Sequence, residues 1–596
     1  MPTKETNRAA KHASVFGPAV MPGFWKNQLA PWFEKHFLVL CLCFVGIGCA
    51  RIISTYSALS LTADEISHFA CGLEYVATHA YRYQTEQPPL SRMMQALGPY
   101  LAGARPLGLP NPEEEGRGVI AHSGNVDRTI FLMRLGNLPF FLLACLVVCG
   151  WSWYAFGKPI AVVATGLFTL LPTVLADGGL ATTDMALGAD VAAAFFATIL
   201  WAERPTWLRA MLLGLFTALA CLSKFTALGY LTGAGCLALA SYLAVRWPGW
   251  RELWRLAKQR AATFALAAAT TALLIWGGYW FSVGQVASHW FSFGTVFSAR
   301  LPAPEFFEGI RVALNHNREG HWAYLLGECR RTGWWYYFPV ALAVKTPVAF
   351  LILFVLGTFV CLRDRARPVH LMPLAFSLGI LLLAMRSRID IGIRHVEPIY
   401  ISFAIISALG FTQLLQWART RANSALTAGV LVAWMAISGA VRHPDYLAYF
   451  NEFAGRNPEN ILVDSNYDWR QDLKLLAKRL HELGVKEFSA AMGGTVQDHQ
   501  YWEAWYGLPN MKDASVSMAS PGWTVVRPTL DKAFKFALLR GSNVPKPWFD
   551  QIVPTERVGS LLLYYTPPAA TSGSRQEVDP GKAPSGSQRP SIAGHR

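Results

Sequence analysis

A short polar stretch, TADEISH (residues 62–68), follows the first long apolar run of this 596-residue chain and carries the side chains best suited to chemistry. Asp64 and Glu65 are adjacent carboxylates, and His68 lies one helical turn beyond Asp64, so Asp64 and His68 share a face if the segment is helical. Like charges this close raise the pKa of one carboxyl, whereas a nearby cation lowers it, so one group can be held as a general base. Carboxylates at the mouth of a membrane span are costly, which indicates a functional role.

A second charged segment, RSRIDIGIRHVEP, spans residues 386–398 at the boundary of a predicted span. A phosphate or pyrophosphate site would explain it, because arginine offers planar bidentate hydrogen bonds to phosphate oxygens. The alternative is a local salt-bridge set formed by Arg388, Asp390, Arg394 and Glu397. Lys224 and Lys345 lie near span ends, where they either snorkel to the interface or reach the same phosphate.

A third acidic feature, LADGGLATTDMA, places Asp177 and Asp184 on the short turn between the third and fourth predicted spans. Thr182, Thr183 and Asp184 are residue types that cap helix N-termini, so they have a structural interpretation as well as a functional one. The two interpretations are compatible.

The elements that must position these side chains are membrane spans. Hydrophobic residues make up 53% of the chain and charged residues only 15%, which exceeds what a soluble protein of this length carries and predicts a polytopic, all-α membrane protein. Apolar runs long enough to cross a bilayer predict about eleven transmembrane helices. They lie near residues 37–59, 130–150, 159–176, 184–202, 207–223, 226–245, 261–282, 339–362, 369–386, 397–416 and 424–441.

Basic residues set the expected orientation, because cytoplasmic loops hold the excess of lysine and arginine. The segment 1–36 is polar and basic, lacks the pattern of a cleaved signal peptide and is expected in the cytoplasm. The formal charge of +15 is then mainly a topology signal and an attraction to anionic lipid, so nucleic acid is not an expected partner. The transmembrane domain is expected over 37–441, with outer loops at 60–129 and 283–338.

Residues 442–567 change to soluble patterning and predict an extracytoplasmic α/β domain. LVDSNYDWRQDLKLLAKRLHELGVKEFSAAMGG indicates strand, loop, amphipathic helix and strand, with Gly484 ending the helix. WTVVRP, KFALLRG and SLLLYYT are expected to be further strands. The remainder, 568–596, is rich in Ser, Gly, Pro and charge and is predicted to be disordered.

These residues together resemble a known family, the lipid-carrier-dependent glycosyltransferases of the GT-C fold, which include protein O-mannosyltransferases and the bacterial aminoarabinose transferase of lipid A. The resemblance covers roughly residues 35–450. It rests on DEISHFACGLEY, EQPPL, LATTD, LSKFTAL, YLLGECRRTGWWYYFPVALAVKTP and GIRHVEPIY, in this order. HPDYLAYFNEFAG and DSNYDWRQDL are similar to the segments that follow the spans in bacterial members, with Arg470 where DWGQDL has glycine.

The resemblance implies an inverting transfer of a sugar from a polyprenyl phosphate to a hydroxyl of a protein, lipid or glycan. Asp64 matches the catalytic aspartate of the first loop and would take the acceptor proton, with Glu65 beside it. The substrate-binding candidates are His68, Arg82, Asp184, Lys224, Arg330, Arg331, Lys345, Arg394 and His395. A divalent metal held by His68, Glu65 and Asp184 is a further hypothesis.

Two other classes of protein stay open at this stage. A secondary transporter is also polytopic, although no internal repeat relates the two halves and the charges lie away from the midplane. A noncatalytic scaffold or sensor would use residues 442–567 as its ligand-binding module. The expected location is the inner membrane, with the site on the periplasmic side.

Overall fold

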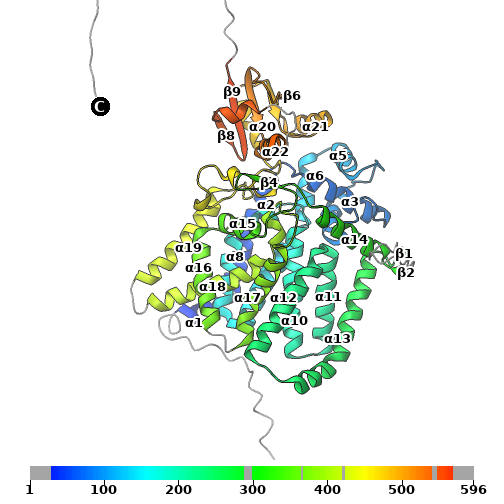
Figure 1. Cartoon of the computed structure of the whole chain (residues 1–596), viewed down its shortest axis with the longest axis vertical. Helices are drawn as coiled ribbons and strands as arrows, with labels where there is room; N and C mark the ends of the chain where they lie inside the picture. The colour runs from blue at the N-terminus through cyan, green and yellow to red at the C-terminus, as the bar shows by residue number, and fades with distance from the viewer. Residues whose placement is uncertain (1–28, 287–298, 364–366, 419–422, 540–545, 568–596) are drawn as a thin grey trace, which may run out of the picture.

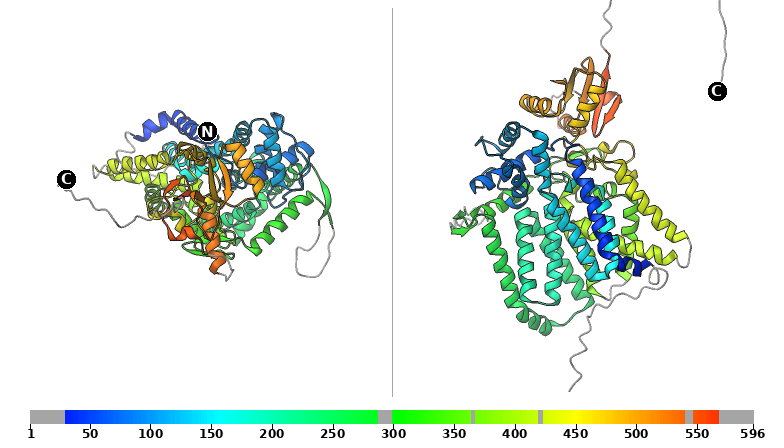
Figure 2. Two further views of the ribbon diagram at one scale, coloured as in Figure 1. Left: turned by 90° about the horizontal axis from the view of Figure 1, so that it is seen from above. Right: turned by 180° about the vertical axis from the view of Figure 1, so that it is seen from behind.

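The computed structural model describes residues 29–286, 299–363, 367–418, 423–539 and 546–567. A bundle of long helices forms the larger part, and a layer of short elements covers one end of it, which we call the loop end (Figure 1). A small sheet-containing region stands above this layer in the front and rear views (Figures 1 and 2). The predictions for residues 1–28 and 568–596 lie outside the described residues.

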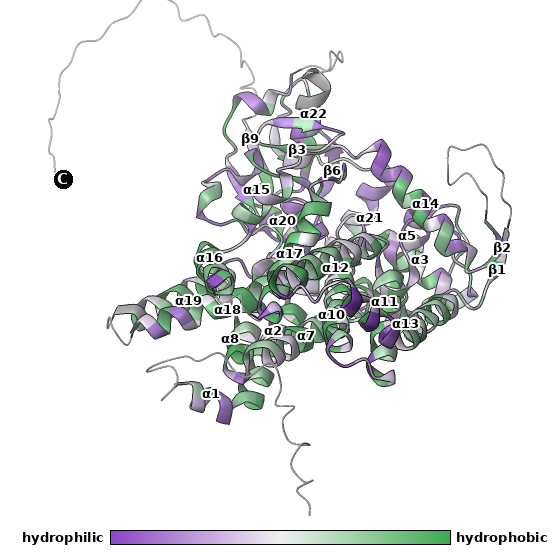
Figure 3. Ribbon diagram, turned by 60° about the horizontal axis from the view of Figure 1, so that its bottom comes forward, coloured by the Kyte–Doolittle hydropathy of each residue, from purple (hydrophilic) through white to green (hydrophobic). Residues whose placement is uncertain are grey.

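Every apolar run expected to span a membrane is helical in the described part of the chain. The bundle consists of α2 (Phe37–Thr55), α6 (Val126–Leu135) continuing into α7 (Leu138–Phe156), α8 (Lys158–Leu170), α9 (Pro172–Gly178), α10 (Asp184–Glu203), α11 (Trp207–Ser223), α12 (Thr226–Val245), α13 (Trp250–Gly278), α15 (Tyr337–Lys345), α16 (Val348–Arg363), α17 (Pro368–Ala384), α18 (Ile399–Ala418) and α19 (Asn423–Val441), with the short α1 (Ala30–Lys35) ahead of it. Hydrophobic residues dominate these helices (Figure 3).

The chain is a multi-pass membrane protein, but the expected count of about eleven spans is not confirmed. Among the described residues, six helices are long and apolar enough to cross a membrane, and the number rises to eight if each of two bent pairs forms one span. The helices Trp207–Ser223, Pro368–Ala384 and Ala425–Val441 are apolar but shorter.

The two bent helix pairs each place a polar side chain in the interior of the bundle. The helices α8 and α9 meet at 69°, and α15 and α16 meet at 117°. Pro172 begins α9, and Pro347 lies between α15 and α16, where a proline cannot continue the preceding helix. As a result Asp177 in α9 and Lys345 at the end of α15 are both buried.

The loop-end layer is made of short helices and two hairpins. It contains α3 (Glu65–Thr78), α4 (Pro89–Leu101), α5 (Pro112–His122), α14 (Pro304–Glu319), and the strands β1 (Val283–Val286), β2 (Ala299–Pro302), β3 (Ala323–Leu325) and β4 (Glu328–Arg330). The helix α4 begins at Pro89, directly after Pro88. Four consecutive aromatic residues, 334–337, lead into α15. Trp334 and Tyr337 are buried, whereas Trp335 is 67% exposed, so only part of this run is available to a membrane interface.

The C-terminal region contains a five-stranded mixed sheet of order β6-β5-β7-β9-β8. Its elements are α20 (Leu473–Glu482), β5 (Glu487–Ala491), α21 (Val496–Tyr506), β6 (Asn510–Asp513), β7 (Gly522–Val526), α22 (Pro528–Leu539), β8 (Glu556–Val558) and β9 (Leu561–Thr566). The strands β6, β5 and β7 are parallel, and β9 is antiparallel to β7 and β8. The sheet-containing region is therefore confirmed.

Two local predictions in this region are wrong. KFALLRG belongs largely to α22, and the expected strand at LVDS is replaced by the 3-10 turn η5 (Asp464–Asn466). In both places an apolar run was too short to distinguish a strand from a helix or a buried turn. The predicted helix before Gly484 is confirmed, and Gly484 has φ of +68° just beyond its end.

The tight crossing of α16 and α18 depends on two glycines. A Cβ on Gly357 would lie 1.8 Å from the carbonyl oxygen of Ile406, and one on Gly410 would lie 2.0 Å from that of Leu353. Both obstacles are backbone atoms, so the helices would have to separate. Small residues are the common means by which membrane helices approach closely.

We expect Gly357→Ala to destabilise the protein by about 1–3 kcal/mol, the usual cost of overpacking a filled interior. Thermal unfolding of the purified protein in detergent, followed by tryptophan fluorescence, measures the change. Gly235→Ala in α12 is the matched control, because a Cβ there meets nothing within 4 Å. Equal midpoints for the two variants would contradict the close crossing.

Candidate active site

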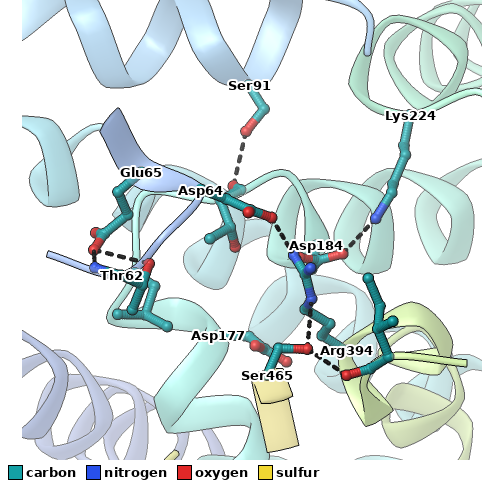
Figure 4. A network of polar contacts seen from close by, with 12 residues as sticks. Thr62, Asp64, Glu65, Ser91, Asp177, Asp184, Lys224, Arg394 and Ser465 are labelled. Atoms are coloured by element: carbon teal, nitrogen blue, oxygen red, sulfur yellow. Dashed lines mark hydrogen bonds and ion pairs between the residues drawn. The ribbon is translucent and has the colours of Figure 1, made fainter. Parts of the chain in front are cut away.

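Asp64 and Asp184 converge on one arginine at the loop end of the bundle (Figure 4). The Nη1 of Arg394 lies 3.1 Å from Oδ2 of Asp64 and 3.2 Å from Oδ2 of Asp184. The side chains of Arg394 and Asp184 are 8% and 0% exposed, whereas that of Asp64 is 38% exposed. Of the two carboxylates, Asp64 is therefore the one accessible to a substrate.

Each of the three side chains comes from a different part of the chain. Asp64 immediately precedes α3, Asp184 begins α10, and Arg394 lies in the 3-10 turn η2 (Ile393–Val396). The turn is held by hydrogen bonds from the N–H of Ile393 to Asn466 and from Tyr230 to the carbonyl of His395. The Arg394 position is therefore set by contacts with both the bundle and the segment after α19.

Lys224 supplies the second buried cation. Its Nζ donates to Oδ1 of Asp184 over 2.6 Å, so it neither snorkels nor stands ready for a phosphate. The carboxylate of Asp184 is thus shared between two cations, which satisfies a charge that would otherwise be costly to bury. The N-capping interpretation is only partly right, since α10 begins at Asp184 but the Thr183 side chain makes no capping hydrogen bond.

Two histidines border the acidic pair as neutral imidazoles. Burial, together with Arg92, lowers the pKa of His68 from its usual 6.5 to about 3. Burial and the charges of Lys224 and Arg394 lower the pKa of His395 well below its usual value. Within the described part of the chain, the Nδ1 of His68 and the Nε2 of His395 are buried and have no hydrogen-bond partner.

Glu65 points away from this centre, unlike the expectation for a catalytic neighbour of Asp64. It forms a completely buried ion pair with Arg134 at 2.9 Å and accepts the backbone N–H groups of Thr62 and Ala181. Burial alone would raise the pKa of Glu65, but Arg134 and these N–H groups lower it overall. Glu65 therefore anchors the loop that carries Asp64.

Lys345 also has a structural role, and its buried side chain is not accessible to a phosphate. Its ammonium donates to the carbonyl oxygens of Leu447, Tyr449 and Asn466, over 2.7, 2.6 and 2.6 Å. These three residues follow α19 in the chain. Lys345 consequently fastens this segment to the end of α15.

The remaining candidate arginines lie on the surface of the loop-end layer. Arg82 and Arg331 are exposed and form no ion pair within the described residues, whereas Arg330 pairs with Glu328 at 2.7 Å. The alternative interpretation of residues 386–398, a local salt-bridge set of Arg388, Asp390, Arg394 and Glu397, does not form. Arg388 instead donates to the carbonyl of Arg318, and Asp390 accepts the N–H of Trp334.

The metal hypothesis for His68, Glu65 and Asp184 is not supported by their arrangement. Glu65 is occupied by Arg134, and Asp184 is occupied by Lys224 and Arg394. No group of three or more His, Cys, Asp or Glu side chains in the described part of the chain is arranged to hold a metal ion.

Sequence reasoning assigned no role to several residues that complete the centre. The hydroxyl of Ser465 accepts a hydrogen bond from the Nε of Arg394. The centre of the Trp469 ring lies 4.1 Å from the guanidinium carbon of Arg394. Asp177, which the sequence grouped with Asp184, and Glu397 are also buried. Arg134, a charge inside a predicted span, was the clearest missed signal.

Residues 41–289 match the family model of dolichyl-phosphate-mannose-protein mannosyltransferase. The expected resemblance to GT-C glycosyltransferases is thereby confirmed for this part of the chain, and the match supports a glycosyltransferase. No curated protein matches the chain significantly.

Two solved structures are similar in fold, with low sequence identity. The crystal structure of ArnT from Cupriavidus metallidurans bound to undecaprenyl phosphate is 13% identical, with 88% of this chain and 97% of that chain covered and a TM-score of 0.46. The archaeal oligosaccharyltransferase AglB from Archaeoglobus fulgidus, in complex with an inhibitory peptide and a dolichol-phosphate, is 11% identical, with coverages of 86% and 72% and a TM-score of 0.42. The family model is the stronger of these findings.

We expect Glu65→Gln to destabilise the protein by about 3–5 kcal/mol, because it leaves the Arg134 guanidinium buried without a counter-charge. Thermal unfolding in detergent tests this expectation. Glu113→Gln serves as the control, since the Glu113 side chain is 65% exposed. A Glu65→Gln variant that unfolds at the native temperature but loses all activity would instead give Glu65 a chemical role.

The lowered pKa of His68 makes the stability of the folded protein depend on pH. Between the ordinary pKa of 6.5 and the folded value of about 3, the unfolded chain binds a proton that the folded chain does not. Stability therefore falls as the pH falls below about 6.5, by about 1 kcal/mol between pH 7 and pH 5.5 from this group. We expect His68→Gln to reduce the difference between the unfolding midpoints at these two pH values. An unchanged difference would show that His68 is protonated in the folded protein.

Proposed function

We propose that the chain is a glycosyltransferase that moves a sugar from a polyprenyl phosphate to a hydroxyl acceptor, with Asp64 as the general base. The arrangement that carries the proposal is the accessible carboxylate of Asp64 held by a buried arginine at the loop end of an apolar bundle. A lipid-linked donor places its phosphate at the same level, where the apolar helices end. The family match over residues 41–289 supports the same reaction class.

The proposed reaction is a single displacement at the anomeric carbon. The acceptor oxygen forms a bond to this carbon while the bond to the phosphate oxygen breaks, which inverts the configuration. Asp64 takes the acceptor proton, and the polyprenyl phosphate leaves with the bonding electron pair. The lipid phosphate needs cations, and Arg82 and Arg331 are exposed arginines without an ion-pair partner among the described residues.

Arg394 orients the base in this proposal. Its bond to Oδ2 of Asp64 leaves the other carboxylate oxygen for the acceptor, and its second bond to Asp184 prevents it from turning toward the substrate. Neutral His68 and His395 add uncharged hydrogen-bonding groups on the same side. An in-line displacement requires the general base and the cations that bind the leaving group to lie on opposite sides of the sugar.

The proposal extends to the organisation of the chain in the membrane. We place residues 37–441 in the bilayer-embedded domain and residues 442–567 in a second domain on the side of the active site. The excess of basic residues in the opposite loops supports an extracytoplasmic, periplasmic site in an inner membrane. The acceptor, whether protein, lipid or glycan, binds from that side.

We expect Asp64→Asn to lower the rate of sugar transfer by about 10²–10⁴-fold, the usual contribution of a general base. The assay uses purified protein in detergent, labelled polyprenyl phosphate sugars and a membrane extract as the source of acceptors. Donor binding and thermal unfolding should remain near native, because asparagine has the same shape. Asp513→Asn is the matched control, since the Asp513 side chain is 73% exposed in the C-terminal region.

Failure of the native protein to consume any donor would contradict the proposal. Proton-coupled solute uptake by the reconstituted protein would then favour a transporter. If Asp64→Asn retained full function while deletion of residues 442–567 abolished it, the chain would be a scaffold or sensor.

A further inference from the structure

Asp464 lies beside the reaction centre but has no part in the mechanism above. It begins the turn η5 (Asp464–Asn466), which is docked directly against the Arg394 segment. The hydroxyl of Ser465 accepts a hydrogen bond from the Nε of Arg394 and donates one to the carbonyl of Ile391. The side-chain oxygen of Asn466 accepts a hydrogen bond from the N–H of Ile393. The Asp464 carboxylate accepts the N–H of Ser465, the residue whose hydroxyl contacts Arg394, so it lies in the turn that is docked against this guanidinium.

The backbone at Asp464 is held in an unusual conformation. Its φ is +60°, in the left-handed region that few residues other than glycine adopt, although Asp and Asn tolerate it best. Its N–H donates to Oγ1 of Thr529 over 2.9 Å, and Thr529 lies in the first turn of the helix α22 of the C-terminal region. Backbone strain that the surroundings maintain is commonly associated with function.

Thr529 is in turn fixed by a buried ion pair of the same region. Its Oγ1 donates to the carbonyl of Asp468, whose carboxylate pairs with Arg527 at 3.0 Å. Arg527 also donates to the carbonyl of Met492, directly after β5. A continuous set of contacts thus leads from the C-terminal sheet to Asp464.

Asp64 and Asp184 contact Arg394 directly, and the charges of Asp464 and Asp177 act on it from farther away. Burial raises the pKa of Asp464, and Asp64 raises it further, while Arg394 and His321 oppose these effects. One oxygen of Asp464 accepts the N–H of Ser465. The other charged or titratable groups that face this cluster are Lys224, His68, His395, His321, Arg92 and Asp177.

We propose that Asp464 is a positioning residue for the transfer reaction. Its negative charge offsets part of the positive charge of Arg394, so that the Asp64 carboxylate stays basic enough to take the acceptor proton. The C-terminal region supports catalysis by holding Asp464 in this place. The inference rests on the proposed function. Without Asp464, more of the Arg394 charge acts on Asp64, which then gives up its proton more readily and is a weaker base.

The pH dependence of kcat/KM for sugar transfer, from about pH 3.5 to about pH 8, tests this inference, because its acidic limb reports the essential base of the free enzyme. We expect Asp464→Asn to move the acidic limb to lower pH by roughly half a unit to one unit, as expected for loss of a charge several ångströms away. The plateau of kcat/KM should fall by about 3–10-fold because the base is weaker. Asparagine matches aspartate in shape and in tolerance of the left-handed backbone, so folding is retained.

Two comparison variants separate charge from structure. Asp464→Glu keeps the negative charge and should return the limb most of the way to its native position. Asp513→Asn removes an exposed aspartate of the C-terminal region and should leave both the limb and the plateau at native values. Activity that falls in Asp464→Asn with an unmoved limb would mean a purely structural role and would overturn the inference.

Thr529→Val provides a second route to the same answer if Asp464→Asn does not fold. It removes the acceptor of the Asp464 N–H without touching any charge, and we expect a smaller shift of the limb in the same direction. A native limb in a folded Thr529→Val protein would contradict control of Asp464 by the C-terminal region. The native protein is measured first, and if it transfers no sugar the proposed function itself fails and the inference fails with it.

Discussion

The ion pairs of Arg394 are the constraint on which the rest of the site depends. A guanidinium buried at the end of an apolar bundle is tolerable only when carboxylates and further hydrogen bonds surround it. Its partners Asp64 and Asp184 are 330 and 210 residues away in the chain, so both must be brought to it by tertiary structure. One charge therefore joins the first loop, the start of α10 and the turn η2, and it leaves only Asp64 accessible.

Two other buried charges secure the parts that meet at Arg394. The Glu65–Arg134 pair fixes the loop immediately after Asp64, and Lys345 fixes the segment after α19 through three carbonyl oxygens. Neither Glu65 nor Lys345 is left with hydrogen-bonding capacity for a substrate. These residues resemble catalytic groups in a sequence because their type and location are the same, but their hydrogen-bonding capacity is used within the protein. Asp464 is held by Thr529 of the C-terminal region, in the turn that contacts Arg394 through Ser465.

Much of the architecture was predictable because it follows from local composition and period. Each apolar run is helical, and the amphipathic segment before Gly484 forms α20. Predictions became wrong where a short apolar run was compatible with two structures, as in KFALLRG. Of the eleven candidate site residues, the structure brings Asp64, Asp184, Lys224 and Arg394 into direct contact, whereas Glu65 and Lys345 form other buried contacts.

The sequence by itself determined that the chain is an apolar helical bundle with polar loops, and it singled out Asp64 by its place at the mouth of a span. Hydrophobic transfer and backbone hydrogen bonding act locally, so their consequences can be read from a run of residues. Only the tertiary structure decided which charges pair. Arg394 could have met Asp390 or Glu397 nearby, yet it meets Asp64 and Asp184, because burial makes the energy of a charge depend on whichever partners the whole fold delivers.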